Sequence, residues 1–203
     1  AYFIAEDRLA RNSERDKQDY RRMTNLATGD RITSEVVVVT PGSYVRKEYV
    51  TAWFTLLRDE YKISFLKIGY DRALSKEWLT DMQEHGFSHE KVHRDGETGS
   101  VTRDLGVLTE VAQGGWTLSE PIKVTKSLFE SGKIVADVRN KLFAYCFYNL
   151  KIRQDVNNNL SPHKAKSTGH IDGAVGVFNA FVAYQRAKEM PLYANRIGHL
   201  FRI

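Results

Sequence analysis

Two acidic residues, far apart in the chain, occupy positions where a fold could make them chemically active. Asp71 directly follows the alternating apolar stretch 63–70, which predicts a strand. Asp172 falls in the first turn of a helix expected to begin at Ile171. The apolar stripe of that helix comprises Ile171, Ala174, Val175, Phe178, Phe181 and Val182. An acid at a helix start is also explained by unpaired N–H groups and the helix dipole, so Asp172 alone does not indicate a site.

A shared divalent cation would allow these two carboxylates to lie close together. Ligands in open α/β sheets bind beyond the carboxyl ends of strands, which is where Asp71 is expected. Two carboxylates a few ångströms apart repel each other unless they share a cation, and an all-oxygen site suits Mg²⁺ or Mn²⁺. A pair of such ions can hydrolyse a phosphodiester, although a third or fourth carboxylate is normally needed. Sequence spacing cannot show whether Asp71 and Asp172 meet.

The elements that would position these acids alternate between strands and helices, which predicts an α/β sandwich. A charged run at 6–22 is interpreted as a solvated helix or arm, and 88–112 has no clear assignment. Strands are expected at 2–4, 34–40, 63–71 and 148–155, and helices at 44–61, 75–86, 119–132, 138–147 and 171–191.

Composition narrows the class of protein further. The 203 residues fit one domain, and the formal net charge of +5 is compatible with a polyanionic partner without requiring one. The single cysteine, Cys146, excludes an internal disulfide framework and a Cys-rich zinc site, and its aromatic neighbours predict a buried, inert thiol. No segment approaches the length of a membrane span, and the first residues lack the order of a signal peptide.

Several segments resemble, in the same order, the C-terminal nuclease domain of tailed-phage terminase large subunits. The most specific are Tyr-Asp-Arg at 70–72 and Lys-Ser-Thr-Gly-x-Ile-Asp-Gly at 166–173. The helix entry at 119–121 lies between them, and "VVVVTPGSYV" is similar to the family's strand and turn, with Ser43 in place of the usual Asn. The resemblance extends over most of residues 1–190.

The resemblance implies a ribonuclease H-like fold, in which a central mixed sheet carries helices on both faces and an acidic metal cluster at its centre. It implies that residues 1–203 form one nuclease domain that cuts double-stranded DNA during genome packaging in the host cytoplasm. Asp71 and Asp172 would be the catalytic metal ligands of a two-ion Mg²⁺ or Mn²⁺ site. The implied partners are double-stranded DNA, the terminase small subunit and the portal protein, with no role for a membrane.

The chain also departs from the family pattern. The family's first acid lies on a strand that would precede Ala1, so the N-terminal strands are apparently missing. Either the sequence is a fragment of a longer one or another acid substitutes. Residue 170 is His where Arg is common, and 88–112 is interpreted as an insertion.

Weaker candidates for DNA contact precede the second acid. Lys164 and Lys166 could hold backbone phosphates as point charges, and His170 could orient water or phosphate, although a solvated loop explains all three. The three tryptophans are interpreted as core or helix anchors, because a duplex exposes few bases for stacking. They are Trp53, Trp78 and Trp116.

Two other functions remain open at this level. The chain could be an inactive remnant that binds DNA or packaging partners without cutting. It could also be another ribonuclease H-like nuclease, such as a junction resolvase, which would prefer four-way junctions to linear duplex.

Overall fold

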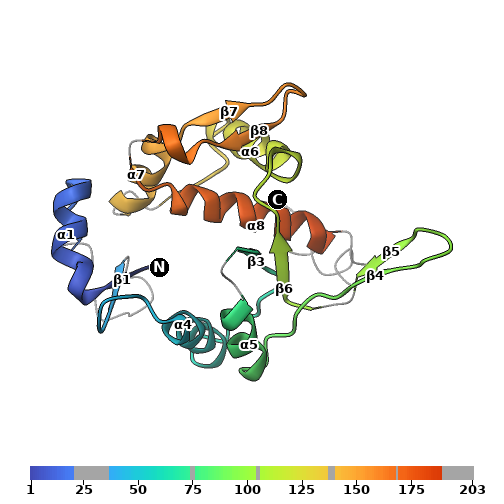
Figure 1. Ribbon diagram of the computed structural model, residues 1–203, viewed down its shortest axis with the longest axis horizontal. Coiled ribbons are helices and arrows are strands. Elements are labelled where there is room, and N and C mark those ends of the chain that lie inside the picture. The colour runs from blue at the N-terminus through green and yellow to red at the C-terminus, as the bar shows by residue number, and fades with distance from the viewer. Residues whose placement is uncertain (21–36, 74–75, 104–105, 137–139, 168, 189–203) are drawn as a thin grey trace.

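The α/β class expected from the sequence is confirmed, but its strands are short and paired two by two. The computed structural model describes residues 1–20, 37–73, 76–103, 106–136, 140–167 and 169–188 (Figure 1). Parts of five expected elements (21–22, 34–36, 75, 138–139 and 189–191), residues 104–105 of the unassigned segment and residue 168 of the second motif lie outside these ranges.

Four of the described strands form two parallel pairs. Strand β1 (Tyr2–Ala5) pairs with β2 (Val37–Thr40), and β3 (Ile68–Asp71) pairs with β6 (Leu108–Val111). No hydrogen-bonded ladder joins the two pairs in the described ranges, so the continuous central sheet expected from the resemblance stays a prediction.

The other described strands form two antiparallel hairpins. Strands β4 (Val92–Arg94) and β5 (Val101–Arg103) form a ribbon that projects from the body of the molecule (Figure 1). Strands β7 (Ile152–Gln154) and β8 (Leu160–Pro162) form the other.

The helices follow the apolar periodicity of the sequence closely. Helix α6 begins at Gly115, earlier than expected, because the carbonyl of Gly114 accepts hydrogen bonds from the N–H groups of Thr117 and Leu118. Helix α8 begins one residue after the expected Ile171. The α-helices are α1 (Glu6–Asp16), α4 (Lys47–Asp59), α5 (Lys76–Glu84), α6 (Gly115–Glu130), α7 (Lys141–Asn149) and α8 (Asp172–Lys188), and η1 (Lys164–Lys166) is a 3₁₀ turn. None of the described helices is long and apolar enough to cross a membrane.

Aromatic side chains join α4 and α5 to the β3–β6 pair. The ring of Phe54 lies 5.4 Å from that of Phe65 and 6.3 Å from that of Trp78, measured between centroids. Trp53 packs edge-on against Phe3 of β1 as well as against Phe54. The interpretation of Trp53 and Trp78 as anchors is therefore confirmed.

Trp116 does not follow that interpretation. Its side chain lies in the first turn of α6 and is 91% exposed. The expectation was wrong because the helix begins before this residue and turns its first side chains toward solvent. The core-facing stripe of α6 starts only at Leu118.

Helix α8 packs against both β3 and β6 and against helices α6 and α7. Its buried stripe includes Phe178 and Val182, which pack with Val111 of β6 and Leu118 of α6. Gly69 of β3 lies so close to the backbone of Asn179 that no side chain would fit between them. This close approach fixes where α8 lies on the strands.

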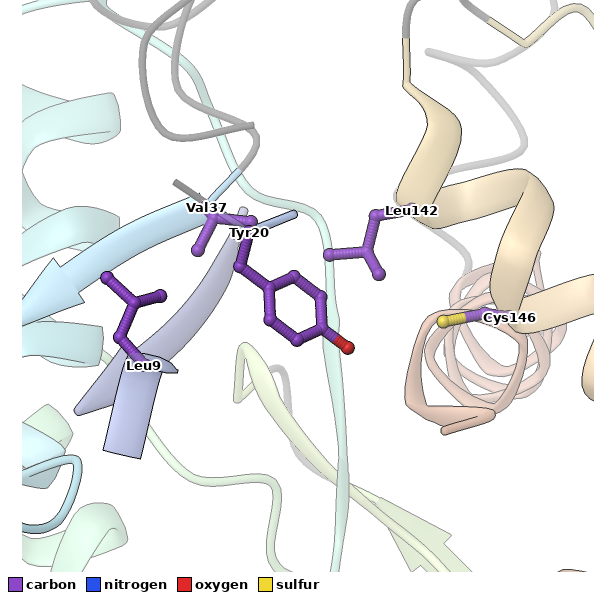
Figure 2. Packing of buried hydrophobic residues seen from close by; sticks show 5 residues of the cluster. All are labelled: Leu9, Tyr20, Val37, Leu142 and Cys146. Atoms are coloured by element: carbon purple, nitrogen blue, oxygen red, sulfur yellow. The ribbon is translucent and has the colours of Figure 1, made fainter. Parts of the chain in front are cut away.

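A second cluster holds α7 to the N-terminal part of the chain. Figure 2 shows the ring of Tyr20 between Val37 and Leu142, with Leu9 and Cys146 at either side. The thiol of Cys146 is buried, as the sequence predicted. Because Leu9 is also buried, α1 is part of the folded body and not only a solvated arm.

A buried ion pair lies at the base of the β4–β5 hairpin. The ammonium of Lys67 lies 3.6 Å from a carboxylate oxygen of Glu90, and both side chains are almost fully buried, at 1% and 4% exposed. Thr109 donates its hydroxyl to Glu90 at 2.8 Å, and Lys67 donates to the carbonyl of Gly106 at 2.6 Å. These contacts tie the two ends of the hairpin segment to β6 and to Lys67, the residue before β3.

Candidate metal and nucleic-acid site

Asp71 is the last residue of β3, as the sequence predicted. Its Oδ1 accepts a hydrogen bond of 3.0 Å from the backbone N–H of Ala73, so the carboxylate supports the turn that leaves the strand. The neighbouring Arg72 lies 3.6 Å from Glu110 of β6. Asp71 is partly exposed at the carboxyl end of the strand.

Asp172 is the first residue of α8, and its side chain is 71% exposed. Its Oδ2 lies 3.4 Å from Nδ1 of His170. The hydrogen bond with His170 holds the pKa of Asp172 below its usual value, and the positive charge of Lys164 acts in the same direction. The structure therefore brings together Lys164, His170 and Asp172 among the residues singled out from the sequence.

His170 lies between two carboxylates. Its Nδ1 faces Asp172, while its Nε2 lies 3.2 Å from Oδ2 of Asp16 and 2.6 Å from Nη2 of Arg15. The hydrogen bond with Asp172 raises the pKa of His170, and the negative charge of Asp16 adds to that effect. A role for His170 in contacting DNA stays a prediction.

Asp16 is the last residue of α1, and its side chain is only 6% exposed. It was not singled out from the sequence. Burial favours its neutral form, but hydrogen bonds from Arg15 (2.7 and 2.9 Å) and Tyr20 (3.0 Å) hold its pKa below the usual value. The one sequence signal is Tyr20 four residues later, at helical spacing, which cannot reveal a contact with residue 170.

A cavity of about 120 Å³ connects these groups. Asp16, His170 and Asp172 supply its ionisable rim, and β1 and α7 supply apolar walls that include Tyr2 and Cys146. Asp71 does not line this cavity.

The positions of the two predicted ligands, Asp71 and Asp172, can be described relative to the carboxyl end of β6. Gln113, just beyond β6, donates to Oδ1 of Asn179 at 3.0 Å, whereas Arg186 near the end of α8 binds the carbonyl of Glu110 within the strand. The N-terminal half of α8 is thus directed toward the carboxyl edge of the parallel pair. Asp71 lies at that same edge, because β3 and β6 are parallel and Asp71 is in register with Val111.

The set of three or more acids expected for a two-ion site is not assembled from the described residues. Across those ranges, no group of three or more His, Cys, Asp or Glu side chains is arranged to hold a metal ion. Whether Asp71 and Asp172 share one cation therefore stays a prediction.

An open groove of about 350 Å³ lies beside α8. Lys164 lines it together with Arg153 and His163, and Val175 of α8 forms part of its wall. Lys166 is exposed in the same 3₁₀ turn as Lys164. Arg153 and His163 were not candidates from the sequence, since nothing in the spacing of 153 and 163–164 shows that the β7–β8 hairpin unites them.

Comparison with known proteins gives one family match and one similar solved structure. The family model described as "Terminase large subunit, endonuclease domain" matches residues 98–189, which include Asp172, Lys164, Lys166 and His170. The crystal structure of the large terminase of bacteriophage HK97 is similar over 89% of this chain, with a TM-score of 0.69 and 19% identity. The chain corresponds to 32% of the length of that protein. No curated protein matches.

The HK97 likeness shows the fold, whereas the family model covers the segment that runs from the β4–β5 hairpin to the end of α8. The resemblance inferred from the Tyr-Asp-Arg and Ile-Asp-Gly motifs is confirmed. Residues 98–189 of this chain therefore match the terminase large subunit endonuclease family, and the chain shares its fold with the large terminase of HK97.

Proposed function

We propose that this chain is a metal-dependent endonuclease that cuts double-stranded phage DNA during genome packaging. One observation carries the proposal. Asp71 ends β3 at the carboxyl edge of the β3–β6 pair, the half of α8 that begins with Asp172 is directed toward that edge, and a basic groove lies beside α8. Ligands of open α/β sheets bind at this edge.

The two carboxylates fit Mg²⁺ or Mn²⁺ by their donor chemistry, because these ions prefer oxygen ligands. Asp71 and Asp172 would hold the ions, which would activate the attacking water and stabilise the leaving oxygen. Asp172 is ionised at neutral pH, as an ordinary aspartate is, and the hydrogen bond with His170 lowers its pKa further. Further oxygen ligands would have to come from substrate phosphate, water or residues outside the described ranges.

The basic groove would hold the DNA backbone. Lys164 and Arg153 line it, and Lys166 is exposed beside it. Lys and Arg bind phosphates without reading bases, so we expect little sequence preference and a strong dependence of binding on salt. His170 faces Asp16 and Asp172 more directly than this groove, so its DNA contact is the weakest of the predicted contacts.

The packaging context adds the remaining parts of the proposal. A terminase nuclease domain would act with the terminase small subunit, the portal protein and an ATPase motor in the host cytoplasm. A ribonuclease H-like arrangement of the β1–β2 and β3–β6 pairs about one central sheet is part of the same proposal.

Plasmid nicking tests the proposed activity. With Mn²⁺ or Mg²⁺, we expect the 203-residue chain, or a longer gene product that contains it, to convert supercoiled plasmid to nicked and linear forms. Asp71→Asn and Asp172→Asn should each abolish cutting, whereas Glu97→Gln, an exposed acid on the β4–β5 turn, should not. Cutting by both Asn variants at the wild-type rate would refute the assignment of the ligands.

One observation favours a second candidate, a chain that binds DNA without cutting it. The described residues do not assemble three acids for a metal site. Salt-sensitive binding of linear duplex without nicking in either metal, by both the 203-residue chain and the longer gene product, would establish this alternative.

A further inference from the structure

The buried carboxylate of Asp16 needs an explanation that the fold alone does not give. The side chain is 6% exposed and ends a helix that is otherwise strongly charged. Burial of an acid is costly unless its oxygens are hydrogen-bonded. Here Arg15 bonds both oxygens and Tyr20 bonds Oδ2.

This cluster reaches across the chain to the loop that precedes α8. Nη2 of Arg15 lies 2.6 Å from Nε2 of His170, a residue 155 positions away, and Oδ2 of Asp16 lies 3.2 Å from the same nitrogen. The other nitrogen of the ring, Nδ1, lies 3.4 Å from Oδ2 of Asp172. One imidazole is therefore held at both ends.

The partners of Nε2 decide where the ring carries its hydrogen. In the neutral ring, Nε2 accepts from Arg15, whose guanidinium is fixed by Asp16, so the hydrogen is on Nδ1. In the charged ring, Nε2–H donates to Asp16 and Nδ1 again carries a hydrogen. In both forms Nδ1–H is directed at Asp172.

We propose that Asp16 is a positioning residue of the site, which holds His170 so that its Nδ1–H orients the carboxylate of Asp172. This inference rests on the proposed function of Asp172 as a metal ligand. A carboxylate that binds a metal must be held within a fraction of an ångström, and a hydrogen bond to one oxygen restricts its rotation. Helix α1 thus contributes to the site from the opposite end of the chain.

The test uses the 203-residue chain with ¹⁵N-labelled histidine and reads the tautomer of the His170 ring by NMR at a pH where the ring is neutral. His170→Gln identifies the signals. In the wild-type protein we expect the hydrogen on Nδ1. In Asp16→Ala we expect the signals to shift toward the Nε2–H tautomer, which is favoured in free imidazole side chains, while the backbone spectrum stays dispersed.

Control variants separate positioning from a purely structural role. Glu14→Gln removes an exposed acid from the same helix and should leave the His170 signals unchanged. Asp16→Glu should restore the Nδ1–H form at least in part, because a carboxylate is again available to Arg15. If Asp16→Ala does not fold, Asp16→Asn keeps the side-chain shape but has the weaker, uncharged acceptor, and the same shift is expected.

Cleavage kinetics give a second readout. Where the protein cuts DNA, Asp16→Ala should lower kcat by about 10- to 100-fold, the usual effect of removing a group that orients a metal ligand, with KM for DNA changed by less than about twofold. Wild-type tautomer signals in a folded Asp16→Ala or Asp16→Asn protein would overturn the proposal, whether or not the chain cuts DNA. Absence of cleavage in the wild type with the expected shift would instead refute only the proposed function.

Discussion

Gly69 of β3 and Asn179 of α8 meet backbone to backbone, and a side chain at residue 69 would overlap the carbonyl group of Asn179. We expect Gly69→Ala to lower the free energy of unfolding by about 1–3 kcal/mol, the usual cost of overpacking, because neither backbone can move freely. Urea unfolding measures the change. Gly176→Ala is the matched control, since nothing lies near its Cβ position and alanine favours a helix, so equal losses in both variants would contradict the close approach.

The Lys67–Glu90 pair should be the most sensitive charged contact of the fold. Lys67→Met leaves the buried Glu90 carboxylate without its nearest cation, which typically costs about 3–5 kcal/mol. The double variant Lys67→Met/Glu90→Gln should recover part of that loss, because it also removes the buried negative charge, and Arg186, which lies 3.9 Å from Glu90, keeps its bond to the carbonyl of Glu110.

The exposed pair formed by Lys47 and Glu77 provides the comparison for that experiment. Lys47→Ala should change the free energy of unfolding by less than about 1 kcal/mol, because the pair is solvated. Chemical denaturation of all the variants under one set of conditions measures these free energies of unfolding. A Lys67→Met protein as stable as Lys47→Ala would show that the Lys67–Glu90 pair is not buried in solution.

The contribution of Asp16 to stability should depend on pH. Its folded-state pKa is lowered, so its contribution is complete above the unfolded carboxyl pKa of about 3.9 and is lost as the pH falls through the lower folded value. The difference in unfolding free energy between wild type and Asp16→Asn should therefore be largest near neutral pH and shrink below about pH 4. A difference that stays constant to pH 3 would disagree with the cluster described.

Trp116 should be the tryptophan most accessible to solvent. We expect Trp116→Phe to remove most of the fluorescence that acrylamide quenches, because Trp53 and Trp78 are packed against other rings. Trp53→Phe should leave that fraction in place. Stability should change by less than about 0.5 kcal/mol in Trp116→Phe, as is usual for exposed positions.

DNA binding should lose salt dependence when the groove is neutralised. Arg153→Ala and Lys164→Ala should each reduce the slope of log K against log [salt] by about 1 if each contacts one phosphate. Lys123→Ala, on the exposed face of α6, should leave the slope unchanged. Fluorescence anisotropy with a labelled linear duplex at several salt concentrations measures all three.

Local pattern was enough to place Asp71 and Asp172. The alternation before residue 71 and the helical stripe after residue 171 each arise from near neighbours, so the strand end and the helix start follow from sequence. The burial of Asp16 could not be predicted in this way, because it depends on a loop that is distant in sequence. The prediction that Trp116 is an anchor was wrong for a related reason, because the exposure of a side chain at a helix start depends on where the helix begins.

The pairing of strands was also beyond the sequence. Each strand of the two parallel pairs is four residues long, and its partner lies more than thirty residues away, so pairing depends on helices such as α1 on β1–β2 and α8 on β3–β6. Uniting Arg153 with Lys164 likewise required the β7–β8 hairpin. Patterns of apolar residues in the sequence show which face of a helix or strand is buried. They do not show which polar side chains from distant segments lie together in the folded molecule.

The turn of the β4–β5 hairpin makes this protein convenient for single-molecule spectroscopy. Asp95 caps the turn by accepting hydrogen bonds from the backbone of Glu97 and Thr98, so the backbone shape does not rely on the side chain of Glu97. The chain's one native thiol, Cys146, is buried. A Glu97→Cys protein would therefore accept one maleimide dye at a defined point, from which the distance to a labelled duplex could be followed by energy transfer.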